Sequence, residues 1–158
     1  KQNSDIRTNL QLNPVSIYTK FWTGLDIGEF DPSSIPSTPQ ECITFYKGLA
    51  YTFYKLLNKC PKANIIYIIE PRNKNSNPFV FDDYIKAIKT ACSHYSIPYI
   101  NLAEECVQLQ PYIDSKQKIY YVWALDGTTL DGTHPGTEGH RLMSYFIESK
   151  ISPYLNHI

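Results

Sequence analysis

Segments typical of strands alternate with segments typical of helices along this chain, and that alternation limits the fold more than any other feature of the sequence. Runs rich in β-branched and aromatic residues predict strands at 15–22, 63–69 and 97–100. Apolar residues at helical spacing predict helices at about 38–58, 81–95, 102–109 and from 137 onward. Such alternation is typical of βαβ crossover units, which form a parallel sheet with helices on its faces. The sequence therefore predicts an α/β fold with three layers, α/β/α.

The first helix has the clearest predicted start. Thr38 is placed to cap it, Pro39 suits the first helical position, and Glu41 completes a Thr-Xaa-Xaa-Glu capping box. Cys60-Pro61 marks its end, because proline lacks the amide hydrogen that would continue a helix. By contrast, periodicity alone does not assign the apolar run at 119–125 to a helix or to a strand.

Length and composition exclude several classes of protein. The 158 residues suit one globular domain, expected at 14–158 after a polar segment at 1–13. Lysine plus arginine (15) balance aspartate plus glutamate (15), so nothing favours nucleic acid or an anionic membrane surface as a partner. No apolar stretch approaches the ~20 residues of a membrane span. The chain begins at Lys1 and its one methionine is Met143, so we expect a soluble domain whose targeting segment is absent or already removed.

The sequence predicts neither a metal site nor a cofactor. Its four cysteines form no Cys-Xaa-Xaa-Cys pair and no zinc-like group with histidines, and they neither require nor exclude disulfides. Cys42 and Cys92 are expected to be buried thiols. His140 lies near two aspartates, but glycine and threonine stand at the alternate positions where a loop for a hard cation needs acidic ligands.

The segment Asp131-Gly-Thr-His134-Pro135 is the strongest candidate for chemistry. Its spacing lets the aspartate accept the Nδ1 proton of the imidazole while Nε2 works on another group, as in the orienter-and-base half of a nucleophilic triad. Because ligands of parallel sheets bind beyond the carboxyl ends of the strands, we expect the site at that edge. A plain turn with a surface histidine is the alternative interpretation of the same residues.

This segment resembles the last conserved block of the SGNH (GDSL-type) serine esterases and lipases. The residues that follow it, Gly139 and a helix with apolar residues on one face, resemble that block too. The strand at 15–22 and the turn at 23–28 resemble the family's Gly-Xaa-Asn-Asp block. The resemblance covers about 14–155 and corresponds to the carboxy-terminal two-thirds of such a hydrolase. It implies that His134 is the base and Asp131 its orienter.

Two blocks of the family depart from its pattern here. No serine lies within two residues of a glycine, so the Gly-Asp-Ser nucleophile block is not found. Ser4, in Asn3–Arg7, matches it only weakly and lacks the glycine, so we expect the nucleophile outside this chain. The resemblance places the oxyanion region at Gly24 and Asp26, where either Leu25 or Asp26 replaces the family's asparagine donor. The first βαβ unit of the fold is also missing.

Two functions follow from this pattern. In the first, the chain is a domain of an ester hydrolase that acts on a carboxyl ester, such as an acetylated carbohydrate or an acyl lipid, with the nucleophile supplied upstream or by a companion chain. In the second, it is a catalytically silent domain that serves as a structural or interaction subunit of a larger assembly. Both predict a protein partner, because an uncovered sheet edge is usually paired or covered.

Overall fold

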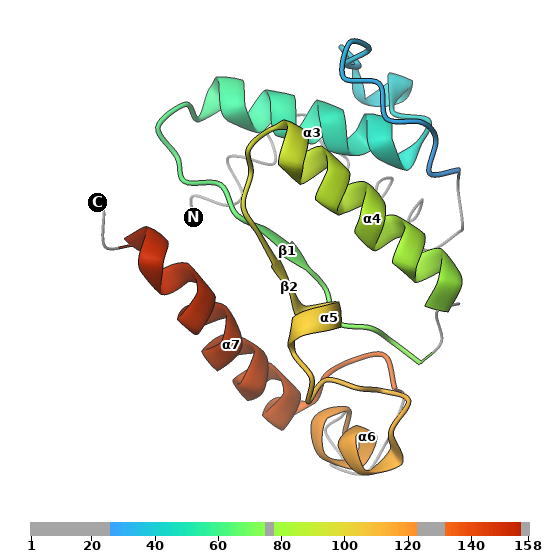
Figure 1. The fold of residues 1–158 in the computed structure, drawn as a ribbon, viewed down its shortest axis with the longest axis vertical. Helices are drawn as coiled ribbons and strands as arrows, with labels where there is room; N and C mark the ends of the chain where they lie inside the picture. Colours follow the sequence, from blue (N-terminus) through green and yellow to red (C-terminus); the bar gives the residue numbers. More distant parts are fainter. Residues whose placement is uncertain (1–25, 75–77, 123–131, 156–158) are drawn as a thin grey trace. The chain divides into compact units, whose positions relative to one another are not determined.

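The computed structural model describes residues 26–74, 78–122 and 132–155, and Figure 1 shows them as a ribbon. By their contacts, the described residues divide into two compact units. The first unit contains 26–65 and 82–98, and the second contains the rest. The predicted strand at 15–22 and the polar segment at 1–13 lie outside the described residues.

Two helices provide most of the buried side chains of the first unit. Helix α3 spans Phe45–Lys59, and helix α4 spans Pro78–His94, of which 82–94 belong to this unit. α3 ends before Cys60-Pro61, as predicted. The buried apolar side chains of these helices are Leu49, Ala50, Tyr51 and Phe53 in α3, and Tyr84, Ile85, Ala87, Ile88, Ala91 and Cys92 in α4.

Aromatic rings of α3 pack edge to face against Tyr84 of α4 and against Tyr95, which directly follows α4. The ring centroids of Phe45 and Tyr84 are 4.7 Å apart, and those of Phe53 and Tyr95 are 5.8 Å apart. Both pairs are close to perpendicular, which is a favoured geometry because the positive ring edge faces the negative ring face. These ring contacts therefore set which faces of the two helices pack against each other within this unit.

The predicted helix start at Thr38 is wrong. Pro39–Glu41 forms only a short 3-10 helix (η1), whereas α3 begins with Thr44 as its N-cap. The Thr44 hydroxyl accepts a hydrogen bond from the Lys47 amide at 3.3 Å. The Thr38 hydroxyl does donate to the Glu41 carboxylate at 2.9 Å, but this bond closes a turn and does not begin the helix.

Residues distant in sequence decide where α3 begins. The carbonyl oxygens of Asp26 and Ile27 accept hydrogen bonds from the amides of Phe45 and Tyr46, at 3.2 and 3.1 Å. The first amides of a helix have no partner inside the helix, so partners supplied from elsewhere stabilise a start at that point. Local capping signals carry no information about such partners.

Among the described residues, a two-stranded parallel sheet and three helices form most of the second unit. Strand β1 (Tyr67–Ile69) pairs with β2 (Tyr99–Asn101), and Ile68 lies opposite Ile100. The helices that follow are α5 (Leu102–Glu105), α6 (Asp114–Tyr120) and α7 (Thr137–Leu155). The parallel pairing and the α/β class are thus confirmed, and α7 begins where the sequence predicts.

The core of the second unit lies between the sheet and α7. Its fully buried members are Ile100, Leu102, Cys106, Leu109 and Tyr121. One face of α7 packs against them, through Leu142, Met143, Phe146, Ile147 and Ile151. The apolar spacing of this helix therefore predicts its buried face correctly.

Other element boundaries differ from the predictions. Both strands are only three residues long, α4 begins at Pro78 rather than near residue 81, and α5 ends at Glu105 rather than near residue 109. The run at 119–125 that periodicity left unassigned begins within α6, Tyr121 just after that helix is fully buried, and 123–125 lie outside the described residues.

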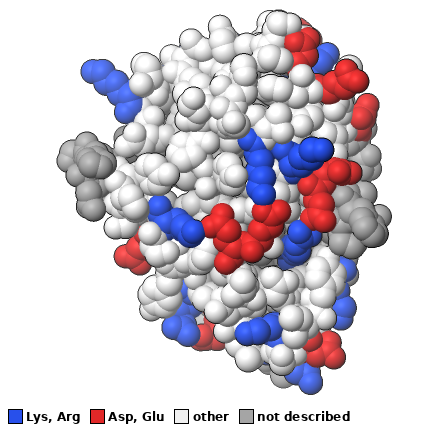
Figure 2. All heavy atoms as spheres, viewed as in Figure 1, with Lys and Arg blue, Asp and Glu red and all other residues white. Residues whose placement is uncertain are grey.

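Charged side chains of both signs adjoin on the face shown in Figure 2. Among the described residues of the second unit, Arg141 pairs with Glu138 at 2.7 Å and Lys150 pairs with Glu105 at 2.6 Å. Within the described ranges, no helix has the length and apolar character needed to cross a membrane.

Candidate functional site

The turn that carries His134 is held by main-chain hydrogen bonds at both ends. Gly132 has φ +66°, a left-handed conformation that favours glycine, and its carbonyl oxygen accepts a hydrogen bond from the Lys74 amide at 2.7 Å. At the other end, the Gly136 amide donates to the Tyr120 carbonyl oxygen at 2.8 Å. The backbone on either side of the imidazole is therefore fixed.

Gly136 approaches another stretch of main chain so closely that no side chain fits. A Cβ atom built there would lie 2.0 Å from the Val122 carbonyl oxygen. One built on Gly139 would lie 2.3 Å from the Tyr120 carbonyl oxygen. Because these neighbours are backbone atoms, they have no rotamer change with which to make room. The entry into α7 thus requires glycine.

The loop after β1 packs beside this turn. The buried Tyr121 hydroxyl donates to the Arg72 carbonyl oxygen at 3.0 Å, and the Tyr112 hydroxyl donates to the Asn73 carbonyl oxygen at 3.0 Å. The next residue, Lys74, provides the amide that binds the His134 turn. The turn therefore lies against the loop at the carboxyl end of β1, which is the sheet edge where the sequence placed the site.

The His134 side chain is exposed. A base that takes a proton from another group needs such access. Its predicted orienter, Asp131, lies outside the described residues, so the pairing of the two side chains stays a prediction.

Asp26, the described member of the predicted oxyanion region, has a structural role in the first unit. Its Oδ1 atom accepts a hydrogen bond from the Gly28 amide at 2.9 Å, and its carbonyl oxygen binds the start of α3. Gly24 and the weak nucleophile candidate Ser4 lie outside the described residues. His134 belongs to the second unit, so the structure describes the two regions separately.

Glu70 is a notable carboxylate that the sequence analysis missed. It directly follows β1, and its Oε1 atom is buried and has no hydrogen-bond partner among the described residues. Burial raises the pKa of this carboxyl above its ordinary value, because the charged form loses hydration. The sequence feature that could have identified Glu70 is its position directly after a strand predicted to be buried.

The buried cysteines are poorly suited to replace the missing nucleophile. All four are free thiols, and Cys42, Cys92 and Cys106 are buried. Burial raises the pKa of Cys92 to about 12 and also raises that of Cys106, which disfavours the reactive thiolate. Among the described residues, no three histidine, cysteine or acidic side chains are grouped as metal ligands.

No protein-family model matches this chain, and no curated protein does either. Solved structures do match it. One is a protein from Lactobacillus plantarum, with a TM-score of 0.65 and 17% identity over 87% of this chain and 64% of that one. Two others are described as putative GDSL-like lipases. The one from Bacteroides ovatus has a TM-score of 0.53 and 17% identity, and the one from Bacteroides uniformis has 0.54 and 21%.

These similarities define the class of fold. The chain has the α/β fold of GDSL-like lipases, so the predicted resemblance to the SGNH family is confirmed at the level of the fold. Each of the two Bacteroides matches covers 85% of this chain. This chain spans 49% and 48% of the lengths of those two proteins, and 64% of the Lactobacillus protein.

Proposed function

We propose that this chain is an SGNH-type ester hydrolase domain in which His134 is the base and Asp131 orients it. The observation that carries the proposal is the turn at Gly132–Gly136. Main-chain hydrogen bonds fix this turn beside the loop at the carboxyl end of β1, and the imidazole on it is exposed. The fold shared with GDSL-like lipases supports the same assignment.

The proposed chemistry is acyl transfer through a serine outside this chain. Nε2 of His134 takes the hydroxyl proton as the serine oxygen bonds to the carbonyl carbon of a carboxyl ester. The imidazolium then returns this proton to the departing alcohol as the ester bond breaks. Water hydrolyses the acyl-enzyme in the same way and releases the carboxylic acid. Asp131 holds the tautomer in which Nε2 accepts the proton.

A segment outside this chain completes the domain in this proposal. The substrate is a carboxyl ester such as an acetylated carbohydrate or an acyl lipid, and the loop at Gly24–Asp26 edges the oxyanion pocket. The nucleophile strand lies upstream in a precursor or on a companion chain, where it completes a three-layer α/β/α sandwich. The two-stranded sheet of the described residues offers an edge for that pairing.

A fluorophosphonate probe tests the proposal, because it labels a serine that a neighbouring base activates. The native material is labelled and the modified peptide is mapped. We expect one labelled serine, on this protein or on a chain bound to it, and loss of the label with His134→Ala. His140→Ala is the matched control, because His140 is also exposed and lies in the first turn of α7. Equal labelling of both variants would refute the role of His134.

The second candidate is a catalytically silent domain that serves as a subunit of a larger assembly. Asp26 favours it, because a carboxylate that braces the Gly28 turn offers no hydrogen-bond donor to an oxyanion. Loss of one such donor costs roughly 2.7–4 kcal/mol of transition-state stabilisation. If no serine is labelled while a control esterase reacts normally, the silent domain is the correct assignment.

A further inference from the structure

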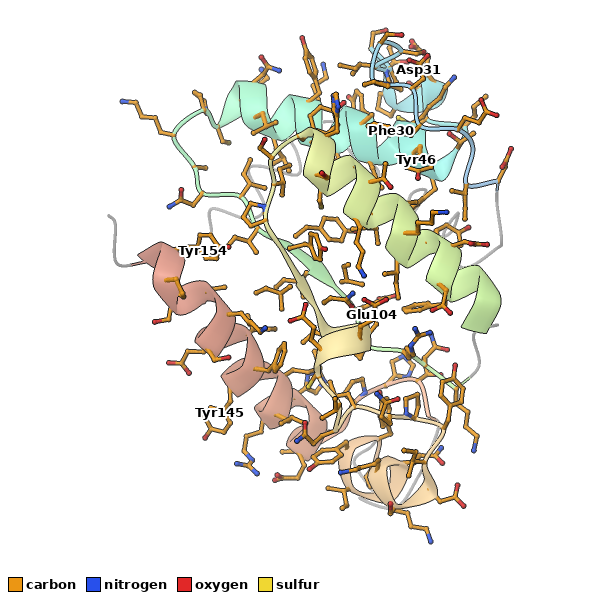
Figure 3. All side chains as sticks on the ribbon, viewed as in Figure 1. Phe30, Asp31, Tyr46, Glu104, Tyr145 and Tyr154 are labelled. Atoms are coloured by element: carbon orange, nitrogen blue, oxygen red, sulfur yellow. The ribbon has the colours of Figure 1, made fainter. Side chains whose placement is uncertain are left out.

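The first unit contains a hollow of about 250 Å³ beside the start of α3. One wall is the loop over 29–34, and the other is the first two turns of the helix. Ala50 is buried at the base, and Phe30 and Tyr46 line it with their rings. Figure 3 labels Phe30, Asp31 and Tyr46, which come together from the loop and the helix.

Hydrogen bonds hold both walls in place. The main chain just before the loop is bonded to the amides of Phe45 and Tyr46, at 3.2 and 3.1 Å. Within the loop, Oδ1 of Asp31 accepts hydrogen bonds from the amide and the hydroxyl of Ser33, at 2.9 and 2.6 Å. A ligand that enters this hollow would therefore meet a preformed surface and would lose little of its binding energy to ordering the protein.

The charges around the hollow oppose one another. Glu29 and Asp31 contribute carboxylates, and Lys47 contributes an ammonium group. In the part of the chain that the structure describes, neither Glu29 nor the Lys47 ammonium takes part in a hydrogen bond or an ion pair. The two carboxylates repel an anion, and the ammonium partly offsets their attraction for a cation. A neutral ligand with several hydroxyl groups can donate hydrogen bonds to the two carboxylates and accept one from the ammonium group.

The start of α3 does not add an anion site. The amides of Phe45, Tyr46 and Lys47 are already bonded, to the two preceding carbonyl oxygens and to the Thr44 hydroxyl. The amides of Phe45–Lys47 are therefore not left to point into the hollow. The polar surface consists of the three charged side chains and the hydroxyl groups of Ser34 and Thr44.

The rings supply the apolar part of the surface. The centroids of Phe30 and Tyr46 are 5.3 Å apart with their planes at 52°, and Phe30 is also 5.3 Å from the His94 ring. The aromatic wall is thus fixed by its own contacts. The volume is just below the range of about 300–1,000 Å³ typical of sites for drug-sized ligands, which suits a single small ring.

We propose that this hollow binds one sugar ring, whose hydroxyl groups bond to Glu29, Asp31 and Lys47 while its C–H face rests on Phe30 and Tyr46. The juxtaposition of opposite charges over an aromatic wall in one preformed cavity is what assigns this ligand class. The site lies within the first unit and does not depend on ester hydrolysis.

Amide chemical shifts of the full ¹⁵N-labelled chain test this site. The probe is methyl β-D-glucopyranoside, and tetramethylammonium and acetate are the charged comparators. We expect the sugar to shift the amides of 29–31, 33–34 and 44–47 in a saturable way, and the two ions to leave them in place. Absence of a saturable sugar response in these amides, or tighter binding of either ion, would overturn the proposal.

Two variants and a matched control sharpen this test. Lys47→Met and Asp31→Asn each remove one charged partner and should weaken sugar binding about tenfold. Lys59→Met changes an exposed lysine at the far end of the same helix and should leave the affinity unchanged. The same spectra report whether each variant is folded. Equal affinity of all three variants and the unmodified chain would refute the assigned contacts.

Discussion

The chain enters α3 and α7 in different ways. Before α3, the loop leaves a hollow lined by side chains, and the glycine of that entry, Gly28, faces the side chain of Thr44. Before α7, main chain packs directly on main chain, and Gly136 leaves no room for a methyl group beside the Val122 carbonyl. The first arrangement has space for a ligand. The second holds the turn that carries His134 in place through backbone atoms, which cannot move aside by changing rotamer.

The largest expected effect comes from a substitution at the start of α7, where main chain packs on main chain. Gly136→Ala places a Cβ atom 2.0 Å from a backbone oxygen, so the start of α7 or residues 120–122 must move. We expect the free energy of unfolding to fall by about 3 kcal/mol, at the upper end of overpacking effects. Urea unfolding followed by circular dichroism measures this loss.

Gly48→Ala is the matched control for that substitution. Gly48 lies inside α3, and a Cβ atom built there meets nothing within 4 Å. Alanine is the better helix former by about 1 kcal/mol, so this variant should be as stable as the unmodified chain or more stable. If Gly136→Ala and Gly48→Ala lost stability equally, the close approach would not be the cause.

The next effect concerns the loop that packs beside the His134 turn. Tyr121→Phe removes the hydroxyl of a fully buried side chain, and with it the hydrogen bond to the Arg72 carbonyl oxygen. We expect a loss of about 1.5 kcal/mol. Tyr112→Phe removes an equally long bond at a residue that is 45% exposed, where water replaces the hydroxyl, so its loss should be clearly smaller. Equal losses in thermal unfolding would contradict this explanation.

A third prediction concerns the start of α3, where the expected effect is smaller. Thr44→Ala removes the side-chain cap of α3 and should cost about 1 kcal/mol. Thr38→Ala, at the predicted but incorrect start, removes only an exposed bond to Glu41 and should cost less than about 0.5 kcal/mol. The two unfolding midpoints in urea decide between these helix starts. A larger loss at Thr38 would mean that the helix is capped there after all.

The smallest effect is a pH dependence from Glu70. Because burial raises its pKa in the folded state, its ionisation opposes folding. This penalty is absent below the ordinary value of 4.5, develops as the pH rises toward the raised value and is constant above it. Glu70→Gln should therefore gain stability relative to the unmodified chain between pH 3.5 and pH 7, by less than about 1 kcal/mol. A stability difference between Glu70→Gln and the unmodified chain that does not change with pH would contradict the raised pKa of Glu70.

The sequence predicted those parts of the fold whose signals are local. The apolar residues at helical spacing in α7 predicted both its start at Thr137 and its buried face. The two predicted strands that lie among the described residues were placed correctly but too long, because an apolar run shows that a segment is buried and does not show how many of its residues pair. The start of α3 was wrong because its first amides bind Asp26 and Ile27, which lie well before the helix in sequence.

The candidate site was predictable to the same extent. The Asp131–Pro135 motif singled out His134, and the rule for parallel sheets indicated the edge where its turn lies. Glu70 and the tyrosines that bind the loop after β1 were missed, because their roles depend on contacts that only the folded chain makes. The hollow beside α3 was missed for the same reason, since no motif marks it.

The parallel register of β1 and β2 has a consequence for the order of folding. Tyr67 pairs with Tyr99, about 30 residues later, and α4 occupies much of the chain between them. A loop of that length must close before the strands gain any hydrogen bond, whereas each turn of α4 forms from its neighbours alone. The sheet that supports the His134 turn is therefore expected to form late, and the rate of refolding should depend on this pairing more than on either long helix.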